Sequence, residues 1–209
     1  MRLPLWIIAW ILIIELLLIL VFVPGEWTER VIKSEQQKVE RALGRETRDW
    51  VYGNAARWYS ATFVETGIYR GMHQLVVPSE TERARSAGME DMGSGLWPWV
   101  EDRLGSLMHV IYQVFARISL MLVWSPYMII LLLPAIWDGM MSWKIKRTNF
   151  DYASPIFHRY GSRSVVVVVQ LLLIAFFAPV ALNPMLAPVA MMVICLLIGV
   201  SVGNFQKRV

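Results

Sequence analysis

The sequence predicts an all-α membrane protein with four transmembrane helices and a helical region outside the membrane between the first and the second. Its 209 residues are 56% hydrophobic and only 17% charged. The apolar residues gather in runs of about 20, the helix length that crosses a hydrocarbon layer about 30 Å thick. The charged residues gather between those runs, in residues 24–117 and 142–164. This alternation is typical of a protein that crosses the membrane several times.

The first element is a transmembrane anchor in residues 1–23. Its apolar run, from Leu5 to Val23, is interrupted only by Glu15. The run is longer than the apolar core of a secretory signal, and no cleavage site of small residues follows it. We therefore expect the anchor to stay uncleaved.

Residues 24–117 are predicted to be a helical region with little core of its own. Apolar residues recur at helical spacing through its first half. They are Trp27, Val31, Val39, Leu43, Trp50, Ala55 and Trp58. Ser, Gly and charged residues dominate 76–95, so this segment is predicted to be a flexible excursion of the chain. A second predicted helix follows it and leads into the next span. A region of this size buries little apolar surface by itself, so we expect helices that lie against the membrane or a partner.

Three further spans are predicted. The second span, 118–141, contains Pro126 and Pro134 and is interpreted as a kinked helix, with a hinge or gate as the alternative. Residues 165–203 are predicted to form a transmembrane hairpin, with spans at 165–182 and 185–202 and a tight turn between them.

The basic residues predict the orientation of these spans. The connection 142–164 carries five Lys and Arg against one Asp, and the tail 204–209 adds two more basic residues. Short connections rich in Lys and Arg stay in the cytoplasm. Region 24–117 holds 12 Lys and Arg against 13 Asp and Glu, and a long region can cross the membrane regardless of charge. We therefore expect both termini in the cytoplasm, 24–117 on the far side of the membrane, which is the periplasm if the cell is Gram-negative, and a multi-pass location.

Recognisable catalytic motifs are absent from the sequence. It contains no GxxxxGK[ST] phosphate loop, no GxSxG elbow and no HExxH pair. Its single cysteine is Cys195, and its three histidines, His73, His109 and His158, lack metal-ligand spacing. We therefore expect no enzymatic activity, no cofactor and no metal site.

Glu15 lies near the middle of the first predicted span. An ionised carboxylate at that depth costs several kcal/mol unless it is paired. We expect an intramembrane polar contact between helices, and a contact between copies in a homo-oligomer is the alternative. A proton relay would need a second titratable group at that depth, and the other predicted spans offer none.

The connection 142–164 is far more polar than the apolar runs on either side. Its first basic residues suit anionic lipid headgroups. Beyond them, aromatic side chains alternate with turn formers, a composition suited to a protein interface. The predicted docking residues are Lys144, Lys146, Arg147, Asn149, Phe150, Asp151, Tyr152, Phe157, His158, Arg159 and Tyr160. A lipid anchor without a docking role is the alternative.

Four stretches resemble the membrane proteins of integrating conjugative elements, a family otherwise described as a domain of unknown function. They are "LVWSPYMIILLLPAIWDG" (122–139), "KIKRTNFDYASPIFHRYG" (144–161), "FAPVALNPMLAPV" (177–189) and "GNFQKRV" (203–209). The resemblance covers essentially the whole chain, and it implies no catalytic residues.

The resemblance implies an inner-membrane accessory of conjugative type IV secretion, encoded with the coupling ATPase. The expected partners are that ATPase or neighbouring membrane subunits, together with membrane lipids, and direct nucleic-acid binding is not expected. Two alternatives remain open. An exclusion factor that blocks redundant mating would carry its specificity in 24–117. A small transporter or gated pore would use Glu15 and the kinked span.

Overall fold

The computed structural model describes residues 5–76, 96–148 and 155–204, and every regular element among them is a helix. The predicted flexible excursion lies almost entirely outside the described residues. The chain divides into two compact units. The first unit comprises Met1–Ser119 and Phe176–Asn183, and the second comprises Leu120–Ala175 and Pro184–Val209.

The first unit begins with the apolar helix α1 (Leu5–Phe22), which is followed by the charged helix α2 (Gly25–Leu43). The backbone is extended at Pro24, and the chain turns through 113° between the two helices. A Cβ at Gly25 would lie 2.7 Å from the Oδ1 of Asp102, so a larger residue at this corner would displace the Asp102 carboxylate. The anchor and the amphipathic helix are thus separate elements set at a steep angle.

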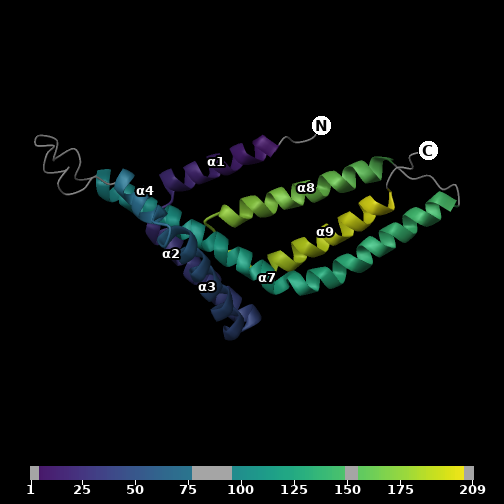
Figure 1. Ribbon diagram of the computed structural model, residues 1–209, viewed down its shortest axis with the longest axis horizontal. Coiled ribbons are helices and arrows are strands. Elements are labelled where there is room, and N and C mark those ends of the chain that lie inside the picture. The colour runs from purple at the N-terminus through teal and green to yellow at the C-terminus, as the bar shows by residue number, and fades with distance from the viewer. Residues whose placement is uncertain (1–4, 77–95, 149–154, 205–209) are drawn as a thin grey trace, which may run out of the picture. The chain divides into compact units, whose positions relative to one another are not determined.

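A hairpin of helices follows. Gly44, with φ of 87°, ends α2 and starts α3 (Arg45–Tyr59); only glycine adopts this backbone region at little cost. Lys33 on α2 shares a polar groove with Tyr52 on α3, so the two helices run antiparallel. A π-helix, η1 (Ser60–Val64), and the short α4 (Ile68–Val76) continue from α3. Figure 1 shows these helices beside the start of α7 (Leu96–Thr148).

These helices enclose a core, contrary to the expectation that the region would have little of its own. The buried apolar residues in α2, α3 and the start of α7 include Val31, Val39, Val51, Ala55, Leu104, Met108 and Val110. The core forms because three helices, rather than two, share their apolar faces. Burial of several large aliphatic side chains stabilises such a unit by about 1.5–3 kcal/mol each.

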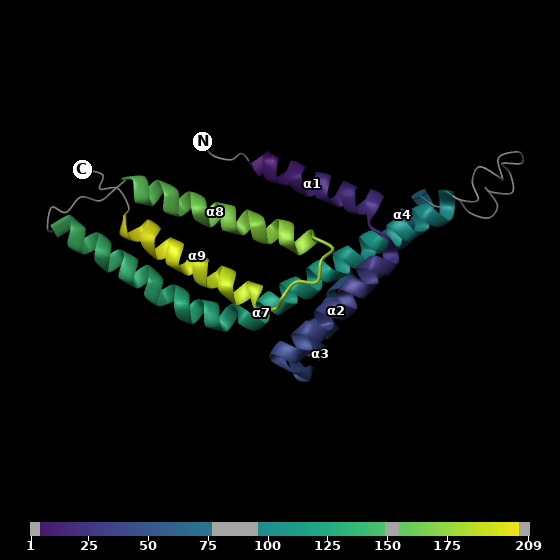
Figure 2. The ribbon, with the colours of Figure 1, turned by 180° about the vertical axis from the view of Figure 1, so that it is seen from behind.

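The second unit contains the rest of α7, the helix α8 (Pro155–Phe177) except its last two residues, and the helix α9 (Leu186–Gly203). Helix α7 continues through both Pro126 and Pro134. Figure 2 shows α9 running along α7. Their backbones approach closely at Gly139, where a Cβ would lie 2.7 Å from the carbonyl oxygen of Gly199. Small residues permit this kind of packing between apolar helices.

The described helices partly bear out the predicted spans. Two have the length and composition to cross a membrane, Trp97–Ile145 and Leu186–Gly203. A third span results if the bent pair Ala9–Phe22 and Gly25–Leu43 is counted as one, whereas the apolar stretch Arg163–Phe177 is shorter. The described residues are therefore helical and include two or three candidate membrane spans, which suggests membrane association. The number of four spans stays a prediction.

The connection between α8 and α9 differs from the expected two-residue turn. Helix α8 ends at Phe177 and α9 begins at Leu186, so residues 178–185 form a non-helical connector. Contacts between this connector and the outer helices occupy carbonyl groups that a longer α8 would bond internally.

Candidate functional site

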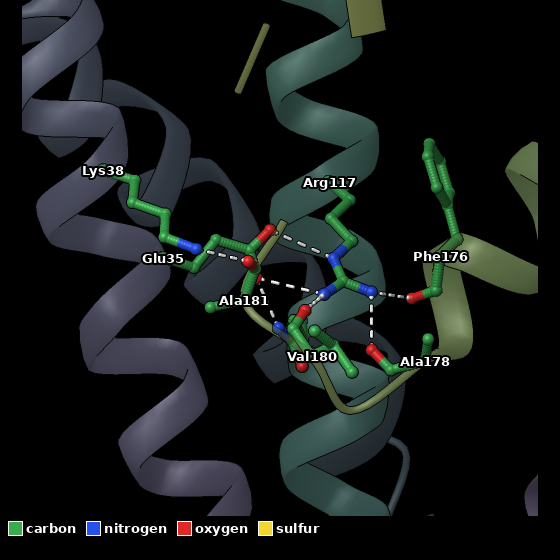
Figure 3. A network of polar contacts seen from close by, with 8 residues as sticks. Glu35, Lys38, Arg117, Phe176, Ala178, Val180 and Ala181 are labelled. Carbon is green, nitrogen blue, oxygen red and sulfur yellow. Dashed lines mark hydrogen bonds and ion pairs between the residues drawn. The ribbon is translucent and has the colours of Figure 1, made fainter. Parts of the chain in front are cut away.

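The most extensive buried polar network in the described residues is centred on Arg117 of α7 (Figure 3). Its Nη1 donates to the carbonyl oxygens of Phe176 (2.7 Å) and Ala178 (3.0 Å), and its Nη2 donates to that of Val180 (2.7 Å). The side chain is almost completely buried. The fork of N–H donors on a guanidinium suits this arrangement of successive carbonyls. Arg117 thereby holds the end of α8 and its connector.

Glu35 of α2 provides the counter-charge for Arg117. Its Oε1 lies 3.1 Å from the Nε of Arg117, and its Oε2 accepts from Nη2 at 3.1 Å. The Nε2 of Gln113 also donates to Oε2. A buried ion pair repays its desolvation only when further hydrogen bonds satisfy both groups, and here both receive them. We call Glu35, Gln113, Arg117 and the bonded carbonyls the Arg117 network.

Two further bonds attach α2 to the connector. The Nε1 of Trp27 donates to the carbonyl oxygen of Pro179 at 3.0 Å, and the Nζ of Lys38 donates to that of Ala181 at 2.5 Å. Trp27 and Lys38 are eleven positions apart, so the contacts extend over about 16 Å of helix at 1.5 Å per residue. Helix α2 therefore lies across the connector and does not project away from it.

The beginning of α2 is fixed to α7 as well. The backbone N–H of Gly25 donates to both carboxylate oxygens of Asp102, at 3.1 and 3.2 Å, and an acid at a helix N-terminus is favourable. The Oγ1 of Thr28 lies 3.0 Å from the Nδ1 of His109. Together with the Glu35 pair, these contacts show that α2 and the start of α7 run in the same direction. The structure thus gives His109 a structural role.

Aromatic side chains fill the other side of α7. Tyr112 packs edge-on against Tyr59, and Phe115 packs edge-on against both Trp58 and Phe63. Burial raises the pKa of the Tyr112 hydroxyl, which keeps it neutral. This cluster positions α3 and η1 through packing.

The contacts at this site hold structural elements together. Residues 5–76, 96–148 and 155–204 contain no group of three or more His, Cys, Asp or Glu side chains that could hold a metal ion. The charged atoms of the Arg117 network are directed at one another and at backbone carbonyls. The network joins two segments that are distant in sequence.

The predicted docking residues are distributed over two helix ends. Lys144, Lys146 and Arg147 lie in the last turns of α7, where Lys144 is exposed, and Asn149, Phe150, Asp151 and Tyr152 lie outside the described residues. Phe157, His158, Arg159 and Tyr160 lie in the first turns of α8, and the Tyr160 side chain is 62% exposed. The docking role of this set stays a prediction.

Glu15 lies on the half-buried face of α1 that also carries the buried Ile19. Its Oε2 is buried and has no hydrogen-bond partner in the part of the chain that the structure describes. This placement agrees with a carboxyl that faces protein, while its polar contact stays a prediction.

Sequence reasoning missed the Arg117 network. One available signal was Glu35, which occupies an apolar-face position midway between Val31 and Val39, four residues from each. Another was Arg117, which directly precedes the apolar run 118–141. Their connection was invisible because 82 positions separate them.

Comparison with protein families matches most of the chain to a described family. A family model described as "IncC plasmid conjugative DNA transfer protein DtrJ-like" matches residues 22–207. The match confirms the resemblance to membrane proteins of conjugative elements. No curated protein matches the chain, and no solved structure matches it.

Proposed function

Because this chain belongs to the DtrJ-like family of IncC plasmid conjugative DNA transfer proteins, we propose that it is a non-enzymatic accessory of conjugation in the bacterial inner membrane. It scaffolds or docks the coupling ATPase or neighbouring membrane subunits of a type IV secretion system. Membership of this family is the observation that supports a role in conjugation. The docking role is supported by the basic and aromatic composition of 144–160 and by the exposure of Lys144 and Tyr160.

A contact between α2 and the connector supports the proposed topology. Trp27 lies in the first turn of α2, the helix that follows α1, and it contacts the connector that follows α8. This contact supports an arrangement in which the carboxyl ends of α1 and α8, which both belong to the first unit, lie on the same side of the membrane. If both helices cross the membrane, their amino ends, and with them 149–154, lie on the opposite side. In this arrangement 144–160 faces the cytoplasm.

The docking role is tested by comparing two sets of substitutions in the same segment. Replacing Phe150, Tyr152, Phe157 and Tyr160 by alanine leaves the basic residues that set orientation, so this variant is expected to insert normally and to lose partner binding and DNA transfer. Buried interface anchors often contribute about 2 kcal/mol or more each. The matched variant replaces Lys144, Lys146 and Arg147 by glutamine and is expected to disturb orientation or lipid contact first. Normal transfer by an inserted aromatic variant would refute docking through this segment.

Topology is tested separately with reporter fusions. A fusion near Ser86 is expected to report the periplasm, and fusions near Ser154 and after Val209 are expected to report the cytoplasm. A cytoplasmic signal at Ser86 would contradict the orientation, whatever the docking experiment shows.

A further inference from the structure

We propose that α2 is an interfacial helix that lies on the outer surface of the membrane, with the phosphates of the lipid headgroups bound along one basic face. This inference rests on the proposed insertion of α1 in the membrane. Three observations support the proposal: the angle between α1 and α2, the contacts of α2 with the connector, and the distribution of charge around α2.

The angle between α1 and α2 places α2 near the membrane plane. The chain turns through 113° at Pro24 and Gly25. If α1 follows the membrane normal, α2 is inclined by 23° to the surface (113 − 90) and directed back toward it. Transmembrane helices are tilted by about 20° on average, which is comparable with this remaining inclination. Helix α2 at this inclination lies roughly parallel to the membrane surface.

The connector places the same helix at the membrane boundary. It joins two apolar helices, and it contacts α2 at Trp27, Glu35 and Lys38 through Pro179, the Arg117 network and Ala181. These contacts extend from Trp27 to Lys38, so α2 remains beside the connector over most of its length. A helix projecting into the periplasm would touch the connector at one end only.

The charges around α2 distinguish a lipid-facing side from a water-facing side. Successive positions three or four residues apart share one face of a helix. One such face contains no acidic residue; it carries Trp27, Arg30, Ser34, Lys38 and Arg41, which we call the basic stripe. A different side contributes Lys33, Gln36, Gln37 and Glu40 to the polar groove against α3. Phosphate groups complement a stripe whose ionisable residues are all cationic.

Trp27 strengthens the assignment to a lipid surface. Its ring is 47% exposed, and the guanidinium of Arg30 lies 5.7 Å from the ring centroid. A second pair of this kind, Trp99 and Arg103 at 5.4 Å, lies at the start of α7. Tryptophan favours the headgroup layer because its ring is apolar and its N–H is polar. Arginine binds phosphate through two parallel hydrogen bonds.

The test uses spin labels in the full-length protein in vesicles of phosphatidylethanolamine and phosphatidylglycerol. Cys195, the only cysteine, is replaced by alanine, and single cysteines are introduced at Ser34 in the basic stripe and at Gln36 on the opposite side. Both positions are half-buried, and both variants keep Trp27 and the arginines. Leu17, 53% exposed on α1, provides the lipid reference.

Collision rates of each nitroxide with oxygen and with a water-soluble nickel chelate report its depth. The ratio of oxygen to nickel collisions is expected to be highest at Leu17, intermediate at Ser34 and lowest at Gln36. If Ser34 is as accessible to nickel as Gln36 while Leu17 is in lipid, the basic stripe faces water or a protein and the inference is wrong. If Leu17 itself is accessible to nickel, the proposed membrane insertion fails instead.

A charge variant provides an independent readout. Replacing the exposed Arg30 and Arg41 by glutamine is expected to shift the Ser34 label toward the aqueous reagent. The matched replacement of Arg45 and Arg70, two exposed arginines outside α2, removes the same net charge and is expected to leave the Ser34 label unchanged. Equal shifts from the two pairs would contradict specific phosphate binding by the basic stripe.

Discussion

The guanidinium of Arg117 and the carboxylate of Glu35 form a buried pair, joined at 3.1 Å by Nε to Oε1 and at 3.1 Å by Nη2 to Oε2. The same guanidinium donates to three backbone carbonyls at the end of α8 and in the connector. One side chain therefore links the outer helix α2 to the segment between two apolar helices.

Removing either member of this pair is expected to destabilise the first unit strongly. Leaving one buried charge without its partner costs about 3–5 kcal/mol, so Glu35→Gln and Arg117→Gln should both lower the melting temperature in detergent. Arg117→Gln should lower it further, because three carbonyls also lose their donor. Circular dichroism during heating measures both changes. Equal and small shifts, comparable with that of an exposed Glu29→Gln variant, would mean that the pair contributes little.

Glycine at position 139 is expected to be essential for the packing of α7 on α9. A Cβ there would lie 2.7 Å from the Gly199 carbonyl oxygen, whereas Gly105, on the same helix, has nothing within 4 Å. Gly139→Ala should destabilise the second unit by about 1–3 kcal/mol. Gly105→Ala should be neutral or stabilising by up to about 1 kcal/mol, because alanine favours the helix. Thermal melting of the two variants side by side decides the question, and a stable Gly139→Ala protein would contradict this packing.

Acid is expected to loosen the corner between α2 and α3. Arg45, followed by Arg48, holds the pKa of the Glu40 carboxyl below its ordinary value of 4.5. A carboxyl with a lowered pKa in the folded state stabilises the protein above pH 4.5, and the contribution is lost as pH falls through the folded pKa. Glu40→Gln should therefore flatten the acid limb of a stability curve measured from pH 7 to 3.

The control for this pH experiment is Glu46→Gln. Glu46 is an exposed residue of α3 for which the described residues show no ion pair. This variant should keep the acid limb of the parent protein. Identical curves for the parent and Glu40→Gln would exclude Glu40 as the group responsible.

The midpoint of α1 is expected to tolerate a neutral polar group but not a cation. Glu15→Gln keeps hydrogen-bonding capacity next to the buried face of α1, whereas Glu15→Lys imposes a charge at that depth. Immunoblotting of membrane fractions should show normal accumulation of the glutamine variant and loss of the lysine variant. Equal accumulation of both proteins would remove any role for burial at this position.

Local patterns made the helices predictable, whereas contacts between distant segments were not. The spacing of Val31 and Val39 predicted α2, and the apolar run from Leu5 predicted α1. The core of the first unit depends on a third helix that follows 77–95 in the chain. The eight-residue connector exists where Arg117 and Lys38 satisfy its carbonyls. None of these hydrogen bonds has a signature in the local sequence, so the turn was expected to be two residues long.

The central claim, that 144–160 docks a conjugation partner, is tested most directly by photo-crosslinking in donor cells that carry the whole transfer system. A photoreactive residue replaces Tyr160 in one strain and Tyr127, within the predicted second span, in another; both side chains are 62% exposed. We expect one dominant protein adduct at Tyr160 that disappears when the transfer system is absent, and lipid adducts at Tyr127. Lipid adducts alone at both positions, with DNA transfer unimpaired, would contradict the claim.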